Sequence, residues 1–363
     1  MPKVKGFLER IKDGDHIIVA EGYIFLFERR GYLKAGPFVP EVMLENPEMV
    51  RSAYKEFVHA GSDVVLAFTY YAHREKMRLI GRENDLLKLN VDALRMAREV
   101  ADDTGTLMAG NISNTNLYSP EKKENDPIIK EIFKEQVQWA VDAGADFIVG
   151  ETFAHLGEGI LALEAIQEVG NGLPSVITYT AVAAEYKDGK YVACDEVPYD
   201  QVCQKTYDAG ATVVGLNCGR GPETMIPILE QIRKTYKGPL AALPVPYRTT
   251  EKEPSFMTVT DPTNGERLFP VNLDVAYCSR TDIERFADKC KELNILYVGI
   301  CCGNQACLTR TLAERLGRNT PASRFSPDMS KHCIFGDDEA VDKSNQSSVR
   351  ARMEQEQQRT DKL

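Results

Sequence analysis

The sequence predicts an α/β protein, a (β/α)8 TIM barrel followed by a C-terminal extension. Short apolar, β-branched segments alternate with amphipathic helical patterns, and the alternation runs through eight such segments. A doubly wound open sheet is the alternative, but it usually has fewer strands, and no glycine-rich dinucleotide fingerprint follows the first segment. We therefore expect a closed parallel barrel at residues 1–318 and an arm or flexible tail at residues 319–363.

A repeated junction marks where helices end and strands begin. Three segments have nearly the same sequence, namely Ala60–Val65, Ala143–Ile148 and Ala209–Val214. In each, the glycine can adopt the left-handed conformation that closes a helix, and an apolar run follows it. Such a run lacks the alternation of a half-exposed strand, so it predicts strands that are buried on both faces.

The predicted elements follow in chain order. The strands are Ile17–Ala20, Val64–Tyr70, Leu107–Asn111, Phe147–Glu151, Val176–Tyr179, Val213–Asn217, Leu240–Pro246 and Tyr297–Ile300. The clearest helical patterns are Pro47–Ala60, Ile128–Ala143, Leu156–Glu168, Thr224–Thr235, Asp282–Leu293 and Gln305–Leu316. After the last helix, Ser344–Leu363 is highly charged and is expected either to be disordered or to pack on another subunit of a homo-oligomer.

Composition argues against several kinds of partner. The net charge is −10, whereas binding to nucleic acid or to an anionic membrane needs clustered basic residues. No apolar run approaches the ~20 residues of a membrane span, and the N-terminus lacks the apolar core of a signal peptide. Nine cysteines in a chain of this size indicate free thiols. We therefore expect a cytoplasmic protein that acts on small molecules.

Three cysteines stand at the ends of predicted strands. Cys218 follows the sixth strand, and Cys301 and Cys302 follow the eighth. Because the carboxyl ends of barrel strands meet at one face, these thiols are expected to converge. Three thiolates suit Zn²⁺, which prefers four tetrahedral ligands, and they leave one position open. A cysteine at a strand end is often only a small buried hydrophobe, so the cysteines alone leave metal binding and packing as comparable alternatives.

The residues around these cysteines resemble those of a known family. The segments that carry the resemblance to the homocysteine S-methyltransferases, and most to their betaine-using members, are Glu28–Pro37, Phe68–Ala72, Gly215–Cys218, Gly299–Gly303 and Pro321–Ser323. The resemblance covers the chain from about Lys5 to about Ser323. It implies that zinc on the three cysteines holds the sulfur of homocysteine, and that this sulfur takes a methyl group from an onium donor to give methionine.

The resemblance also implies residues that bind the two substrates. Glu151, at the end of the fourth strand, matches the family glutamate that binds the ammonium group of homocysteine, although a carboxylate is also favoured at a helix N-terminus. Asn217 either orients substrate or satisfies loop backbone. Aromatic faces near the first two strands would attract a methylated cation, although such residues more often belong to a core. They are Tyr23, Phe38, Tyr70 and Tyr71.

The sequence departs from the betaine-using members at three positions. Ala20 stands where they have an aspartate that helps bind homocysteine. Glu21 either replaces that aspartate or points elsewhere, because neighbouring strand residues face opposite sides. Phe38 and Thr152 replace a tryptophan and a tyrosine that are expected to bind the carboxylate of the donor. We therefore expect glycine betaine to be a poor donor, and a longer or sulfonium donor to be better.

Two questions of function stay open in the sequence. The donor could be S-methylmethionine, dimethylsulfoniopropionate or another betaine, with its carboxylate bound by Thr152 and Arg248, unless Arg248 is simply exposed. From a different class, a catalytically inactive zinc-binding barrel with a regulatory or structural role is the alternative, because Ala20 has lost a substrate-binding carboxylate. A cobalamin-dependent methionine synthase is excluded, since 363 residues cannot hold its folate and cobalamin modules.

Overall fold

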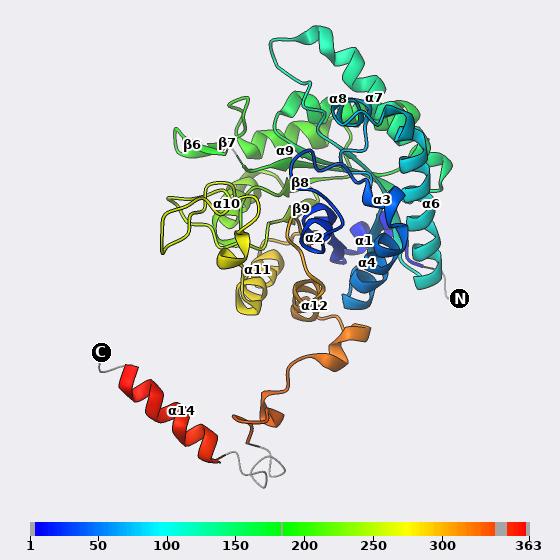
Figure 1. The fold of residues 1–363 in the computed structure, drawn as a ribbon. Helices are drawn as coiled ribbons and strands as arrows, with labels where there is room; N and C mark the ends of the chain where they lie inside the picture. The colour runs from blue at the N-terminus through cyan, green and yellow to red at the C-terminus, as the bar shows by residue number, and fades with distance from the viewer. Residues whose placement is uncertain (1–3, 183, 338–346, 361–363) are drawn as a thin grey trace. The chain divides into compact units, whose positions relative to one another are not determined.

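The computed structural model describes residues 4–182, 184–337 and 347–360 of the chain. It divides into two compact units, Met1–Pro321 and Ala322–Leu363. In the first unit, eight parallel strands close into a barrel in the order β1-β10-β9-β8-β5-β4-β3-β2, with helices around it (Figure 1). The predicted closed barrel is therefore confirmed, and the open sheet is excluded.

The elements of the barrel unit have the following bounds. The strands are β1 (Ile17–Ala20), β2 (Val64–Leu66), β3 (Leu107–Ser113), β4 (Phe147–Phe153), β5 (Ser175–Thr180), the hairpin β6 (Glu185–Lys187) and β7 (Lys190–Val192), β8 (Val213–Asn217), β9 (Leu240–Leu243) and β10 (Tyr297–Ile300). The helices are α1 (Phe7–Asp13), α2 (Tyr23–Arg29), α3 (Val42–Glu45), α4 (Pro47–Ala60), α5 (Arg74–Leu79), α6 (Leu86–Thr104), α7 (Asp126–Asp142), α8 (Leu156–Val169), α9 (Tyr199–Asp208), α10 (Pro222–Thr235), α11 (Arg280–Glu292) and α12 (Ala306–Arg315). Short 3₁₀ helices are η1 (Glu83–Asp85), η2 (Lys123–Asn125) and η3 (Leu273–Ala276).

The repeated glycine junctions close helices as predicted. Gly61, Gly144 and Gly210 have φ angles of 119°, 76° and 107°, in the left-handed region that glycine adopts without strain. Of the strands that follow them, β2 and β8 are buried along their whole length and β4 is buried except at Thr152; every residue of β1, β3, β9 and β10 is buried as well. Side chains inside the barrel and under the surrounding helices thus form one continuous core.

Two strands are shorter than the sequence predicted. β2 ends at Leu66, because the chain turns back there and the Thr69 amide donates to the carbonyl of Ala67 at 2.8 Å. β9 ends at Leu243, because Pro244 has no N–H to continue the ladder. The hairpin of β6 and β7 was not predicted. Each shortened strand leaves an irregular segment at the carboxyl end of the barrel, where the candidate site lies.

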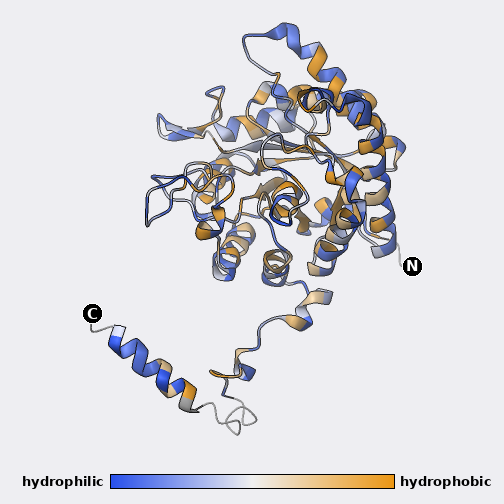
Figure 2. Ribbon diagram, viewed as in Figure 1, coloured by the Kyte–Doolittle hydropathy of each residue, from blue (hydrophilic) through white to orange (hydrophobic). Residues whose placement is uncertain are grey.

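The C-terminal unit combines a mostly polar helix with several exposed apolar side chains, among them Phe325, Met329 and Phe335. Its elements are the 3₁₀ helices η4 (Pro321–Phe325), which begins in the first unit, and η5 (Met329–Lys331), and the helix α14 (Ser347–Thr360). The colouring of α14 is mostly hydrophilic (Figure 2). Arg350 of this helix donates to the carbonyls of Ile334 and Gly336. Part of the tail predicted to be disordered or to pack on a partner is thus helical, and 338–346 and 361–363 lie outside the described residues.

No helix among the described residues is long and apolar enough to cross a membrane.

Candidate active site

Three cysteine thiols converge at the carboxyl ends of β8 and β10. The Sγ atoms of Cys218, Cys301 and Cys302 all lie within 4.8 Å of one another, and those of Cys301 and Cys302 are 3.9 Å apart. A tetrahedral zinc ion with Zn–S bonds of about 2.3 Å needs sulfur atoms about 3.8 Å apart. The spacing and the chemistry of the three donors therefore fit a thiolate-bound zinc ion with one open position.

The backbone around the thiols is held by strand-end hydrogen bonds and one close approach. The amides of Cys218 and Cys301 donate to the carbonyls of Leu243 and Pro244, both at 2.9 Å. Gly22 has a φ of 80°, and a Cβ atom there would lie 2.4 Å from the carbonyl oxygen of Cys301. Because no larger residue fits, this glycine allows the loop after β1 to lie directly against the Cys301–Cys302 backbone.

The three thiols share their protons unequally when no cation is bound. Hydrogen bonds from Cys301 and Cys302 hold the pKa of Cys218 well below its ordinary value. Donating to Cys218, together with burial, raises the pKa of Cys301 and of Cys302 well above the ordinary value. Negative charge therefore gathers first on Cys218, and a bound metal cation would favour the thiolate form of all three.

Two buried carboxylates lie beside the thiols. Oxygen atoms of Glu21 and Glu151 lie within 4.8 Å of each other and of the Cys301 sulfur. The two side chains are 1% and 4% exposed. Burial raises the pKa of Glu151 to about 7, and burial and the neighbouring Glu151 raise that of Glu21 well above its ordinary value. Among the described residues, neither oxygen of Glu21 has a hydrogen-bond partner. The pair thus lacks a compensating cation.

Side-chain amides fix the orientation of Glu151. Asn111 donates to one carboxylate oxygen at 2.7 Å, and Asn217 donates to the other at 2.9 Å. Asn217 also bonds to Thr152, accepting from its amide at 2.9 Å and donating to its hydroxyl at 2.8 Å. Thr152 has a φ of 67°, which is a strained conformation for a β-branched residue. The strain is retained at this site because Asn217 clamps the backbone of Thr152.

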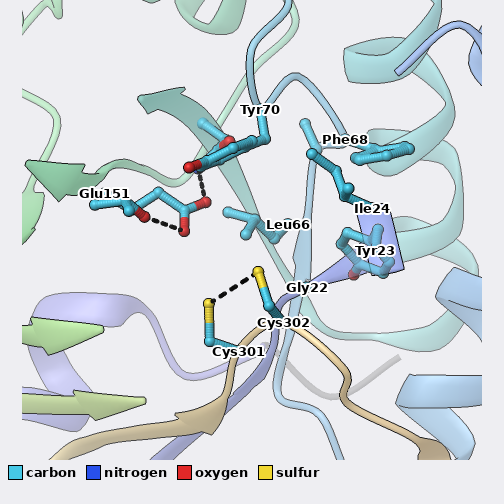
Figure 3. A pocket seen from close by; sticks show the side chains of 12 residues that line it. Gly22, Tyr23, Ile24, Leu66, Phe68, Tyr70, Glu151, Cys301 and Cys302 are labelled. Carbon is cyan, nitrogen blue, oxygen red and sulfur yellow. Dashed lines mark hydrogen bonds between the residues drawn. The ribbon is translucent and has the colours of Figure 1, made fainter. Parts of the chain in front are cut away.

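A mainly apolar cavity opens above these polar groups (Figure 3). Figure 3 shows the sulfur atoms of Cys301 and Cys302 pointing toward the Glu151 carboxylate and the ring of Tyr70. The lining residues are Gly22, Tyr23, Ile24, Leu66, Ala67, Phe68, Tyr70, Asn111, Glu151, Thr152, Cys301 and Cys302. None of these described lining residues is basic, so the wall offers no charge that would neutralise the thiols and carboxylates.

Two of the four aromatic residues predicted to bind the donor line the cavity, and two do not. Tyr23 and Tyr70 line the cavity, whereas Phe38 and Tyr71 are not among its lining residues. Phe38 stacks on Phe25, with ring centroids 5.5 Å apart. Tyr71 packs on Tyr70 with centroids 4.3 Å apart, and its own ring lies under the ammonium group of Lys76 at 4.0 Å. Only two of the four predicted aromatic residues therefore line this cavity.

Arg248 is the surface residue that the sequence allowed as an alternative. Its guanidinium group contacts Asp282 at 3.0 Å, its side chain is 58% exposed, and it does not line the cavity. The structure thus offers no support for Arg248 as a partner of a donor carboxylate.

Several groups of the site were missed by the sequence analysis. Ile24, Leu66 and Phe68 line the cavity, but the sequence analysis assigned nothing to Ile24 and placed Leu66 and Phe68 only in a predicted strand. Apolar residues that point inward look alike in sequence whether they pack in the core or line a cavity. No sequence signal therefore distinguishes these lining residues from core residues.

Fold and site together define a barrel enzyme with thiols and carboxylates gathered at the carboxyl ends of its strands. Residues 26–316 match the family model of the homocysteine S-methyltransferases. The chain therefore belongs to the homocysteine S-methyltransferase family, as the resemblance implied, and is an S-methyltransferase that uses homocysteine as acceptor.

Similar proteins include enzymes named for different methyl donors. The chain is 32% identical to betaine–homocysteine S-methyltransferase 1 of Pongo abelii, which covers 97% of this chain and 84% of that protein. It is 31% identical to S-methylmethionine–homocysteine S-methyltransferase BHMT2 of the same species, and that match covers 97% of this chain and 91% of the other protein. Among solved structures, the oxidised form of the homocysteine methyltransferase MmuM of Escherichia coli shares the fold, with a TM-score of 0.64, 16% identity and coverage of 87% and 100%.

Proposed function

We propose that this enzyme moves a methyl group from an onium donor to the thiolate of homocysteine, giving methionine, with Zn²⁺ held by Cys218, Cys301 and Cys302. The observation that carries the proposal is the meeting of three thiols and two buried carboxyl groups, of which Cys301, Cys302 and Glu151 line a mainly apolar cavity. When bound, the metal keeps the homocysteine sulfur in its thiolate form at neutral pH. All other steps follow from residues of this chain.

The carboxylate pair is suited to the ammonium group of homocysteine. Glu21 and Glu151 are buried, close together and without a cationic partner among the cavity-lining residues described. A buried charge without a partner is costly, and a charge-assisted hydrogen bond stabilises by roughly 1.5–3 kcal/mol. The ammonium group would donate charge-assisted hydrogen bonds to both carboxylates, while Asn111 and Asn217 hold the orientation of the Glu151 carboxylate.

The methyl transfer needs no proton transfer by the protein in the reacting step. The thiol proton leaves when homocysteine binds as thiolate. A sulfur–carbon bond then forms while the bond between the methyl carbon and the onium centre breaks, and its electron pair stays on the leaving sulfur or nitrogen. An anion and a cation become neutral, which a water-poor cavity favours. Tyr23 and Tyr70 line the cavity, and their aromatic rings would attract the onium methyl groups.

The position of Glu21 argues against the alternative hypothesis of a catalytically inactive barrel. That alternative depended on Ala20, where a substrate-binding carboxylate has been lost. The carboxylate of the next residue, Glu21, lies beside Glu151 and Cys301. A carboxyl group is therefore retained at the site, and this favours catalysis over a purely structural role.

The donor is proposed from the charge of the cavity. Similarity does not decide it, because the betaine-named and S-methylmethionine-named relatives are 32% and 31% identical. The lining residues of the described cavity include no arginine or lysine, and the hydroxyl of Thr152 is already bonded to Asn217. The carboxylate of glycine betaine, which is only one methylene from its onium centre, would thus lie near acidic groups without a partner, whereas a longer donor can hold its carboxylate further from them. We propose a sulfonium or longer onium compound as the better donor.

The metal site can be tested by alanine variants. The purified enzyme is expected to hold about one zinc ion per chain. The double variant Cys301→Ala, Cys302→Ala is expected to lose most of this zinc, because the one remaining thiolate cannot hold the ion. Metal content is measured by mass spectrometry together with methionine formation. Cys194→Ala, an exposed cysteine away from the cavity, is the matched control and should keep its zinc. Full zinc occupancy in the double variant would contradict the assignment.

The acceptor site can be tested by neutral isosteres. Glu21→Gln and Glu151→Gln are each expected to weaken homocysteine binding by roughly 1.5–3 kcal/mol, with a much smaller change in the KM of the donor. Calorimetry measures the affinity. Glu158→Gln, which removes a buried carboxylate that bonds to Thr115 instead, should leave homocysteine affinity nearly unchanged. Wild-type affinity in both site variants would mean that the ammonium group is bound elsewhere.

The donor proposal is tested by comparing kcat/KM for glycine betaine, dimethylsulfoniopropionate and S-methylmethionine with homocysteine in excess. A sulfonium compound is expected to exceed glycine betaine by at least about tenfold, or ~1.4 kcal/mol of transition-state binding. A tenfold preference for glycine betaine would overturn the argument from cavity charge while leaving the acceptor and metal assignments intact.

A further inference from the structure

A second cavity is lined by residues of α2, of α4 and of the segment that begins α12. Figure 1 shows where these helices lie in the barrel unit. Its volume is about 390 Å³. The lining residues are Leu26, Arg29, Arg30, Glu56, Gly303, Asn304, Gln305, Ala306 and Cys307. No residue described as lining it also lines the active-site cavity. The proposed methyl transfer gives this cavity no role.

The first turn of α12 forms one wall of this cavity. The helix has ten residues, its N-cap Gln305 provides no side-chain hydrogen bond, and its first turn contains no acidic residue. The first amides of a helix have no partner within the helix, and the helix dipole makes this end positive. Gln305, Ala306 and Cys307 all line the cavity, so this uncapped end borders the space.

Asn304 adds a buried donor that has no partner. Its side chain is 1% exposed, and its Oδ1 atom accepts a hydrogen bond from the Thr309 hydroxyl at 3.1 Å. That bond fixes the amide so that Nδ2 is the free end, and no described group accepts from Nδ2. An unsatisfied buried donor costs about 1–3 kcal/mol, which a ligand acceptor in the cavity would recover.

Arg29 supplies the positive charge. Its guanidinium carbon lies 5.7 Å and 5.5 Å from the ring centroids of Tyr247 and Tyr277, which hold it in place. Its Nη1 atom is buried without a hydrogen-bond partner among the described residues. Nη2 contacts Asp274 at 3.2 Å, but that aspartate is 70% exposed and screened by water. Arg29 therefore retains a donor and most of its charge for a ligand.

Arg30 contributes less, because it is already paired. Its guanidinium group contacts Glu56 at 2.7 Å, so these two lining charges offset each other. The remaining charge on the cavity wall is positive: Arg29, the free amide of Asn304 and the start of α12 are all donors. Because the Glu56 carboxylate is paired with Arg30, the donors of Arg29, Asn304 and the start of α12 favour an oxyanion over a cation.

We propose that this cavity is a second ligand site that binds the phosphate group of a small phosphorylated metabolite. Arginine and backbone amides at a helix start are the groups that bind phosphate in proteins. In barrels, phosphate sites are frequent at the loops after the last strands, and α12 follows the eighth barrel strand. The volume exceeds that of phosphate alone, so a monoester is favoured over the free ion. This role is independent of the methyl transfer.

The test is calorimetric titration of the full-length, zinc-loaded enzyme at constant ionic strength, with inorganic phosphate and with glycerol 3-phosphate as probes. Each is expected to bind at one site per chain, the ester more tightly, and to bind equally well in saturating homocysteine. Arg29→Gln and Asn304→Asp should each weaken binding at least about tenfold, or ~1.4 kcal/mol. Arg285→Gln, an exposed arginine outside this cavity, is the matched control and should bind as the wild type.

Three outcomes would overturn the proposal. One is the absence of saturable binding of both probes by the wild-type enzyme. Another is wild-type affinity in Arg29→Gln and Asn304→Asp, with circular dichroism showing that both are folded. The third is complete displacement of the probes by homocysteine, which would place them in the active-site cavity. If one variant does not fold, the other decides, because each removes a different donor from the same cavity.

Discussion

Uncompensated negative charge at the barrel mouth is the constraint on which the rest of the structure depends. Three thiols and two carboxylates, those of Cys218, Cys301, Cys302, Glu21 and Glu151, lie within two overlapping groups that share Cys301. No basic residue is among the described residues that line their cavity. Burial raises the pKa of both glutamates, whereas hydrogen bonds from Cys301 and Cys302 hold the pKa of Cys218 well below its ordinary value. Such a site is complete only when cations enter it, one for the sulfur atoms and one for the carboxylates.

The barrel positions these groups by bringing separate strand ends close together. β8 and β10 are separated only by β9 in the barrel, so the cysteines at their ends meet above it. Local backbone then sets the final geometry. Gly22 admits the carbonyl of Cys301, and Thr152 is kept in a strained conformation by Asn217. The polar groups of the site are thus positioned by rigid strand ends and by a small number of local contacts. Such rigid support suits a site that must bind an ion and a small amino acid in fixed positions.

The sequence predicted the parts of this site that depend on strand order, and missed those that depend on loop conformation. Cys218 and Cys301 were placed correctly on the same face because each follows a buried strand. Strand alternation left the direction of Glu21 open, but β1 ends at Ala20 and the chain turns at Gly22, so alternation no longer applies there. Phe38 was predicted in the donor pocket but stacks on Phe25, since its loop has no regular period from which to infer a direction.

The central claim is that three protein thiolates hold a zinc ion whose open position takes the homocysteine sulfur. Zinc-edge X-ray absorption of the purified enzyme, with and without homocysteine, measures this directly. The account predicts three sulfur neighbours at about 2.3 Å in the free enzyme and a fourth sulfur neighbour once homocysteine is bound. A sulfur count that stays the same when homocysteine is bound, or fewer than three sulfur neighbours in the free enzyme, would contradict it.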